Sequence, residues 1–246
     1  MKAIILAGGK GTRGKPYTDY FPKAMTPVGD RPLIDHIVRY VSGFEFISEV
    51  VIISDFEGLG GQIKNYYLDH DGKKLSFIQD SQRGTGGDLI HAANILDNSE
   101  FVLWFADNLC AIDLEKMTDV FRIKKSTACI ATRSTRHEET GFAIVKDGMV
   151  QEFVEKPTMN LQMPECLGIY ILGMEVIKRI KSQKKENINL SYDILQYLSK
   201  EKSISAFDIG DSNWIDVESP AILERNQDIV KKIIQQMESR TAAQTV

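Results

Sequence analysis

The sequence is poor in cysteine and has no long apolar run. Its three cysteines are odd in number, and none of them forms a C-x-x-C pair. This usage argues against disulfides and against a zinc site, and it favours a reducing compartment. No apolar run approaches the roughly 18 residues of a membrane span, and the run over residues 3–7 is too short for the core of a signal peptide. We therefore expect a cytoplasmic protein with no membrane partner.

The sequence also has no excess of basic residues. Its net charge of −4 provides no basic surface of the kind that binds nucleic acid, so we expect no nucleic-acid partner. The hydrophobic content of 43% and charged content of 26% are ordinary for a globular protein. A chain of 246 residues with this composition is long enough to bury a sizeable core.

In the first half of the chain, short apolar runs alternate with segments of helical period. Strands are predicted over residues 2–7, 49–54, 75–79 and 101–106. Helices are predicted over 32–41, around Ile63, over roughly 87–97 and around Met117. Such alternation is typical of a mostly parallel sheet that is covered by helices on both faces.

In the second half the pattern becomes rich in strands. Strands are predicted over 129–133, 141–146, 149–156 and 167–173, with a hairpin at Asp147-Gly148. Helices are predicted near 174–181, 191–200 and 218–238, and no repeat or linker divides the chain. We therefore predict one α/β domain over residues 1–246. It has a Rossmann-like, mostly parallel mixed sheet with helices on both faces and an inserted β-rich part.

The glycine-rich stretch AGGKGTRGKP, residues 7–16, follows a predicted buried strand. Its backbone N–H groups can therefore converge on an anion. A dinucleotide site would need an acidic residue about 20 positions later, at the end of a second strand. Asp30 lies in a turn instead, and Asp55 comes too late. A P-loop would need serine or threonine after the lysine, where this chain has Pro16. Both interpretations fail on their context.

A longer pattern begins at the same loop. The stretch G-K-G-T-R is followed in order by P-x-T, P-K, P-V and P-L-I, up to residue 34. This set resembles the signature of the sugar-phosphate nucleotidylyltransferases, or NDP-sugar pyrophosphorylases, of the short single-domain type with the nucleotide-diphospho-sugar transferase fold. Further landmarks follow in the family's order: R-G-T-G-G at 83–87, Asp107, Gly141, F-V-E-K-P at 153–157, G-I-Y at 168–170 and W-I-D-V at 214–217.

The resemblance implies a Mg²⁺-dependent enzyme that converts a nucleoside triphosphate and a sugar 1-phosphate into an NDP-sugar and pyrophosphate. Arg13 and Lys23 are then the catalytic candidates, since a guanidinium can fork onto the β- and γ-phosphates and an ammonium can sit beside the α-phosphate. Asp107 and Asp216 are the candidate Mg²⁺ ligands. His36, by contrast, is predicted to pack in the core.

The same resemblance divides the domain. Residues 1–110 approximately would bind the nucleotide, residues 111–220 the sugar phosphate, and a helix over about 218–238 would close the chain. The nucleotide-binding candidates are Leu6, Ala7, Gly8, Gly9, Gly11, Thr12, Gln79, Gln82, Gly84, Thr85 and Gly87. The sugar-phosphate-binding candidates are Gly141, Glu155, Lys156 and Gly168.

Two glutamines near the third predicted strand bear on the choice of base. The amides of Gln79 and Gln82 offer a donor and an acceptor to uracil or thymine, and they can serve the guanine edge nearly as well. The T-G-G turn resembles that of short single-domain relatives that use UTP or GTP, and we expect UTP or dTTP, with GTP next. Gly14, Ala106 and Cys166 replace residues that are usual in the family. These departures motivate an alternative hypothesis, a catalytically weak regulatory subunit that binds nucleotide sugars. The sugar stays open, as does a homo-oligomeric state, although dimers are common among relatives.

Overall fold

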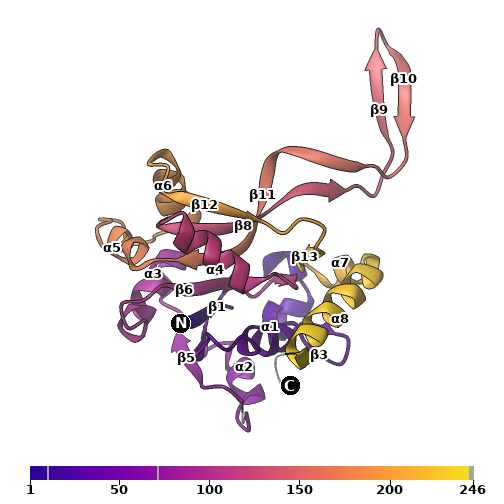
Figure 1. Cartoon of the computed structure of the whole chain (residues 1–246). Coiled ribbons are helices and arrows are strands. Elements are labelled where there is room, and N and C mark those ends of the chain that lie inside the picture. Colours follow the sequence, from indigo (N-terminus) through magenta and orange to yellow (C-terminus); the bar gives the residue numbers. More distant parts are fainter. Residues whose placement is uncertain (10, 71, 244–246) are drawn as a thin grey trace.

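The computed structural model describes residues 1–9, 11–70 and 72–243, and a seven-stranded sheet forms the centre of this part of the chain (Figure 1). The strands of this sheet are β1 (Lys2–Leu6), β4 (Glu49–Ser54), β5 (Leu75–Gln79), β6 (Phe101–Phe105), β8 (Ala128–His137), β11 (Thr158–Leu172) and β12 (Ile204–Asp208). Their order is β12-β8-β11-β6-β1-β4-β5. Only β11 runs antiparallel to its neighbours in this sheet, which is therefore mixed but mostly parallel, as predicted.

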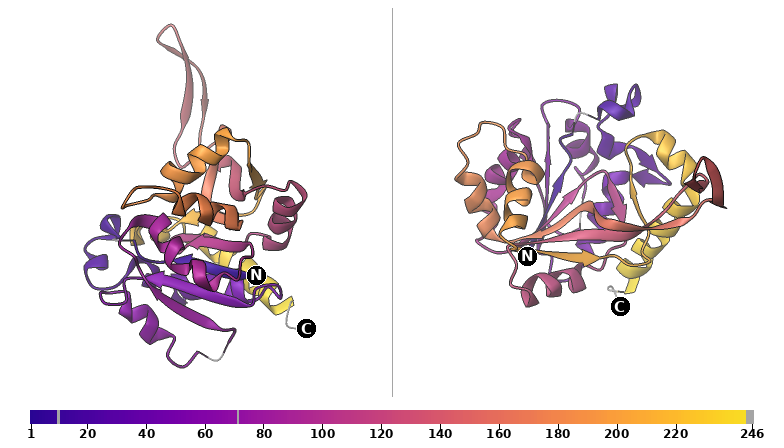
Figure 2. Two further views of the ribbon diagram at one scale, coloured as in Figure 1. Left: turned by 90° about the vertical axis from the view of Figure 1, so that its left-hand side faces the viewer. Right: turned by 90° about the horizontal axis from the view of Figure 1, so that it is seen from above.

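Helices cover both faces of the sheet (Figures 1 and 2). They are α1 (Leu33–Ser42), α2 (Gly61–Tyr66), α3 (Gly84–Ala92), α4 (Leu114–Ile123), α5 (Met174–Lys181), α6 (Gln196–Lys200), α7 (Pro220–Arg225) and α8 (Gln227–Ala243). Five short helical turns accompany them, three before α1 and two farther along the chain: η1 (Thr12–Gly14), η2 (Tyr17–Asp19), η3 (Lys23–Met25), η4 (Ala93–Ile95) and η5 (Leu190–Leu195). None of the helices just given is long and apolar enough to cross a bilayer.

The alternation of side chains along β1 divides the core into two layers. Ala3 and Ile5 belong to the layer that contains α1, α4 and α8, whereas Ile4 belongs to the layer that contains α3, α5 and α6. All three side chains are fully buried. Successive residues of a strand point to opposite faces, so a strand that is buried on both faces needs the continuous apolar run seen in the sequence.

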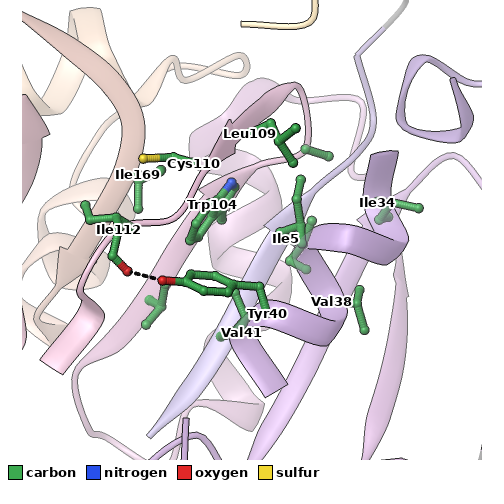
Figure 3. Close-up of a cluster of buried hydrophobic side chains, with 14 of the residues drawn as sticks. Ile5, Ile34, Val38, Tyr40, Val41, Trp104, Leu109, Cys110, Ile112 and Ile169 are labelled. Carbon is green, nitrogen blue, oxygen red and sulfur yellow. Dashed lines mark hydrogen bonds between the residues drawn. The ribbon is translucent and has the colours of Figure 1, made fainter. Parts of the chain in front are cut away.

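Two buried aromatic side chains fix the segment that follows β6 (Figure 3). The Tyr40 hydroxyl donates to the carbonyl oxygen of Ile112 at 2.7 Å, and the Trp104 indole N–H donates to the carbonyl oxygen of Asn108 at 2.8 Å. The two rings meet edge to face, with centroids 6.3 Å apart. Aromatic residues with a polar tip are stable in a core when the tip finds a partner, as both do here. They hold the chain beyond β6 in one position.

The secondary structure differs from the prediction in two respects. The predicted closing helix is broken into α7 and α8, because Asn226 between them leaves the helical region of backbone space, with φ −112° and ψ 28°. The sequence pattern also missed the short strands β2 (Pro27–Val28), β3 (Arg31–Pro32), β7 (Asn108–Cys110) and β13 (Trp214–Asp216), and β12 of the main sheet. The strands of two or three residues are too short to show a periodic pattern.

The predicted β-rich insertion is split between two places. Strands β8 and β11 belong to the main sheet, whereas the hairpin of β9 (Phe142–Lys146) and β10 (Met149–Val154) stands away from it (Figures 1 and 2). The tight turn at Asp147-Gly148 has positive φ at both residues, which confirms the predicted hairpin turn. The pairing of β8 with β11 continues to His137 and Thr158, and this ribbon carries the hairpin outward.

Candidate active site

A cavity of about 560 Å³ opens at the carboxyl ends of four parallel strands. In open α/β sheets, ligands bind outside these ends where the strand order reverses. Here the reversal falls at β1, which lies between β4 and β6. The cavity is lined by Leu6, Ala7, Gly8 and Gly9 after β1, Asp55 after β4, Asp80 and Gln82 after β5, Phe105, Ala106 and Asp107 after β6, and Lys23, Ala24, Gly84, Thr85, Asp88 and Asn187.

Two carboxylates that are distant in the sequence meet at this cavity. Strand β13 pairs with β7 so that Asp216 lies opposite Asn108, and the N–H of Val217 donates to the carbonyl oxygen of Asp107 at 2.7 Å. The Lys23 ammonium lies between the two side chains, 2.8 Å from Oδ2 of Asp107 and 3.7 Å from Oδ1 of Asp216. The predicted lysine and both predicted metal ligands, Lys23, Asp107 and Asp216, therefore form one cluster, the Lys23 group.

The environment of Asp216 is unfavourable for its own negative charge. Burial raises the pKa of the Asp216 carboxyl above its ordinary value, and the charge of Asp107 raises that pKa further, while Lys23 and Arg13 oppose both effects. Oδ1 of Asp216 is buried and accepts no hydrogen bond from any residue that the structure describes. A buried carboxylate oxygen without a donor is costly, and a cation would satisfy it.

The donor set fits a magnesium ion. Mg²⁺ is usually bound by one or two carboxylates, together with water and phosphate oxygens of the substrate. Asp107 and Asp216 supply two carboxylates, one with the orphaned oxygen. No group of three or more acidic, histidine or cysteine ligands gathers anywhere within residues 1–9, 11–70 and 72–243, this site included. These two residues would therefore hold the ion jointly with phosphate oxygens.

Asn108 positions this group, and sequence reasoning did not single it out. Its side-chain amide donates to Oδ1 of Asp107 at 2.7 Å, and its amide oxygen accepts the indole N–H of Trp214 at 3.1 Å. Gly168 makes room for it: the glycine has φ +70°, and a Cβ there would lie 2.6 Å from the Asn108 amide nitrogen. The predicted Gly168 thus lies beside the carboxylates, and the Asp-Asn pair directly after a buried strand was the available signal.

Arg13 reaches the same region from the loop after β1. Its guanidinium pairs with the carboxylate of Glu218, and it is close enough to lower the pKa of Asp216. The side chain predicted to hold the β- and γ-phosphates therefore has an anionic partner within the chain itself.

The predicted phosphate loop forms the wall of the cavity beside β1. Gly8 and Gly9 line the cavity directly, and Gly11 has the left-handed φ of 59° that glycine tolerates. The carbonyl oxygen of Gly11 accepts the Thr18 hydroxyl at 2.7 Å, which ties the loop to the threonine of the motif. Thr12 begins the turn η1. Lys10 of the same motif lies outside the described residues.

The candidates after β5 separate into those inside the cavity and those outside it. Gln82, Gly84 and Thr85 line it, whereas Gly87 is buried against Ser81. Gln79 lines a different cavity, on the side that contains His91. Its amide donates to Oδ1 of Asp55 at 2.9 Å, and its amide oxygen accepts the N–H of Phe56 at 2.9 Å. Gln79 therefore does not contribute to the predicted base site, and its neighbour Asp80 faces the cavity instead.

Three of the sugar-phosphate candidates lie apart from the carboxylates. Gly141 contacts Phe153 and Glu155, and the N–H of Lys156 donates to the carbonyl oxygen of Thr140, so these residues meet one another at the base of the projecting hairpin. The outward course of the β8–β11 ribbon is the reason that they do not reach the Lys23 group. Their predicted role has no support from this geometry.

A second cavity, of about 490 Å³, shares Asp216 and Glu218 with the site. Its walls include Arg133, Arg136 and Trp214. The Arg133 guanidinium lies over the Trp214 ring at 4.6 Å from its centroid and donates to Glu165 at 2.8 Å. This cavity combines an aromatic face with two cationic side chains beside one of the paired carboxylates.

His36 is not part of the site. Its side chain is buried under the first helix, and its Nε2 lies 2.7 Å from the carbonyl oxygen of Val28. Burial lowers the pKa of this imidazole below its ordinary value of 6.5. The prediction that His36 packs in the core is confirmed.

The family model described as nucleotidyl transferase matches residues 2–232. The chain belongs to the nucleotidyl transferase family. The match confirms the resemblance read from the loop and the landmarks behind it. In this chain, the residues of the Lys23 group and of the cavity after β1 come from nearly the whole matched length.

Curated relatives of this nucleotidyl transferase differ in the base that their names specify. The chain is 28% identical to a mannose-1-phosphate guanyltransferase of Saccharomyces cerevisiae over 89% of its own length and 62% of the relative, so it spans less than two thirds of that protein. It is 25% identical to a probable glucose-1-phosphate cytidylyltransferase of Bacillus subtilis, covering 84% of the chain and 87% of the relative. Names alone therefore do not single out one base.

A solved structure shows the same fold. A putative glucose-1-phosphate thymidylyltransferase from Bacillus anthracis superposes with a TM-score of 0.75 and 24% identity, covering 94% of this chain and 95% of that chain. At this identity the likeness establishes the α/β fold, and it agrees with the predicted fold class.

Proposed function

We propose that this chain transfers a nucleotidyl group from a nucleoside triphosphate to a sugar 1-phosphate, releasing pyrophosphate and forming an NDP-sugar. The observation that carries the proposal is the group of Lys23, Asp107 and Asp216, of which Lys23 and Asp107 line the cavity after β1. Relatives named as guanyltransferase and cytidylyltransferase of sugar 1-phosphates support the reaction class. Because the lysine and both candidate metal ligands are present and lie together, this group favours an enzyme over the alternative of a regulatory subunit with little turnover.

The attacking atom is a phosphate oxygen of the sugar 1-phosphate, which is already anionic. It approaches the α-phosphorus in line, a P–O bond forms, and the bond to the leaving pyrophosphate breaks. No protein base or covalent nucleophile is needed, so the protein contributes position and charge. Lys23 places a compact positive charge beside the α-phosphate, and the N–H groups of the loop after β1 face the triphosphate.

Arg13 and the second cavity complete the assignment. Arg13 exchanges Glu218 for the β- and γ-phosphates when the triphosphate binds, a contact that a planar guanidinium makes with two parallel hydrogen bonds. The second cavity supports a place for the sugar 1-phosphate, because it shares Asp216 and is lined by Arg133, which would exchange its partners Glu165 and Trp214 for the phosphate. When bound by Asp107 and Asp216, Mg²⁺ would neutralise charge that develops on the phosphate oxygens.

The direct test is pyrophosphate release from the purified chain with Mg²⁺, each of five nucleoside triphosphates and a panel of sugar 1-phosphates. We expect release that depends on both substrates, with an NDP-sugar as the second product. Reactions without the sugar 1-phosphate control for simple hydrolysis. No release above this control with any pair in a broad panel would contradict the proposal.

A further inference from the structure

A carboxylate lines the cavity after β1 at the place predicted to bind the base of the nucleotide. Asp80 is the first residue beyond β5, and its side chain lines the cavity beside Gly8. A Cβ on Gly8 would collide with Oδ2 of Asp80, so the carboxylate lies directly against the backbone of the loop after β1. Gln79, the amide expected at this place, is turned away and bonded to Asp55 and Phe56.

Asp80 is held firmly and still has a free oxygen. Its N–H donates to the carbonyl oxygen of Ser54 at 2.9 Å, which continues the pairing of β4 with β5 beyond the strand end. Oδ1 accepts the N–H of Gln82 at 2.5 Å, whereas no residue in the described part of the chain donates to Oδ2. The nearby carboxylate of Asp88 differs from that of Asp80 in burial: the Asp88 side chain is buried, and the N–H and hydroxyl of Ser81 both donate to its Oδ1.

The bases differ in what they offer to a carboxylate, which accepts hydrogen bonds and donates none. Guanine presents two adjacent donors, N1–H and N2–H. Uracil and thymine present one donor, N3–H, between two carbonyl oxygens that a carboxylate repels. Cytosine and adenine each present an amino group beside a ring nitrogen that is itself an acceptor. Only guanine can place two donors side by side on one carboxylate.

We propose that Asp80 reads the base and makes GTP the preferred triphosphate. This inference rests on the proposed function, and it deepens that function by naming the nucleotide. Gln82 lines the same cavity, and its amide supplies a donor of the kind that the guanine O6 requires. A residue fixed at a strand end needs no rearrangement to make such contacts, which favours discrimination.

The test is equilibrium binding of nucleotides to the full chain, measured by calorimetry. We expect GTP to bind more tightly than UTP, dTTP, CTP and ATP by about 10- to 100-fold, the range usual for one bidentate base contact. ITP, which lacks the 2-amino group, should bind more weakly than GTP. Asp80→Asn should remove most of the preference for GTP and improve binding of XTP, because an amide can donate to the xanthine O2 and accept its N1–H. Asp97→Asn, the same change at an exposed position, is the matched control.

Several results would overturn the assignment. UTP or dTTP binding as tightly as GTP would do so, and so would a full GTP preference in Asp80→Asn. Loss of the preference in Asp55→Asn alone would give the role to the other carboxylate. If Asp80→Asn does not fold, equal binding of GTP and ITP to the native chain still refutes the proposal that Asp80 binds the 2-amino group of guanine. GTP-selective binding without pyrophosphate release would instead contradict the proposed function and support the role of Asp80.

Discussion

Replacing Lys23 with methionine removes the one ammonium between the two paired carboxylates while keeping a chain of similar length. At an effective dielectric constant of about 20, unit charges at 2.8 Å and 3.7 Å attract by about 6 and about 4 kcal/mol. Both carboxylates are one-third exposed, so water screens much of this attraction and the net cost to stability is far smaller. In the transition state of the variant, no lysine charge remains beside the α-phosphate. We expect turnover to fall about 100-fold or more, which corresponds to about 2.7 kcal/mol.

The assay is steady-state pyrophosphate release at saturating Mg²⁺, with thermal unfolding of each variant as a check on the fold. Lys178→Met is the matched control, because Lys178 lies on α5, does not line the cavity, and pairs with Glu175 at the surface. The control should keep its turnover, and Lys23→Met should lose turnover while still unfolding cooperatively. If Lys23→Met kept more than a third of the native turnover, Lys23 would have no role at the α-phosphate.

Three further outcomes follow from the site and the core. Glu218→Gln frees Arg13 from an exposed ion pair, so KM for the triphosphate should fall about two- to fivefold at similar kcat, and a higher KM would contradict the competition. Asp107→Asn should raise the Mg²⁺ concentration for half-maximal rate at least about tenfold, whereas an unchanged Mg²⁺ titration would refute its role as a ligand. His36 has a lowered pKa in the folded chain, so the unfolded chain binds a proton first as pH falls below 6.5. The free energy of unfolding from urea titrations should therefore decline from pH 7.5 to 5.5, by up to about 1.4 kcal/mol per pH unit, and His36→Gln should show less of this decline.

Much of the central sheet and of the charged group could be predicted from local patterns. The strand that ends at Leu6 and the strand that ends at Phe105 are short apolar runs bounded by polar residues or glycine. The carboxyl ends of these strands meet at one edge of the parallel sheet, which brings Asp107 and the glycine loop together. Lys23 and Asp216 required the ordered motif, because an isolated lysine or aspartate carries no such signal.

The features that the sequence could not show depend on the direction of individual side chains and on pairing between segments that are distant in the sequence. Successive side chains at a strand end point to opposite sides, so one step along the chain separates Gln79 outside the cavity from Asp80 inside it. The position of the hairpin depends on how far β8 and β11 stay paired, which is a property of two segments and of neither alone. The contact of Arg13 with Glu218 joins residues 205 positions apart.

The pairing of β7 with β13 also sets the order in which activity appears as the chain folds. Every residue that lines the nucleotide cavity precedes residues 214–217 in the chain and is therefore synthesised first. The second carboxylate arrives only when this late segment closes a loop of more than 100 residues onto Asn108. Such closure loses chain entropy before its contacts form. During synthesis, nucleotide binding should therefore appear before turnover, because turnover also requires residues 214–217 to be in place.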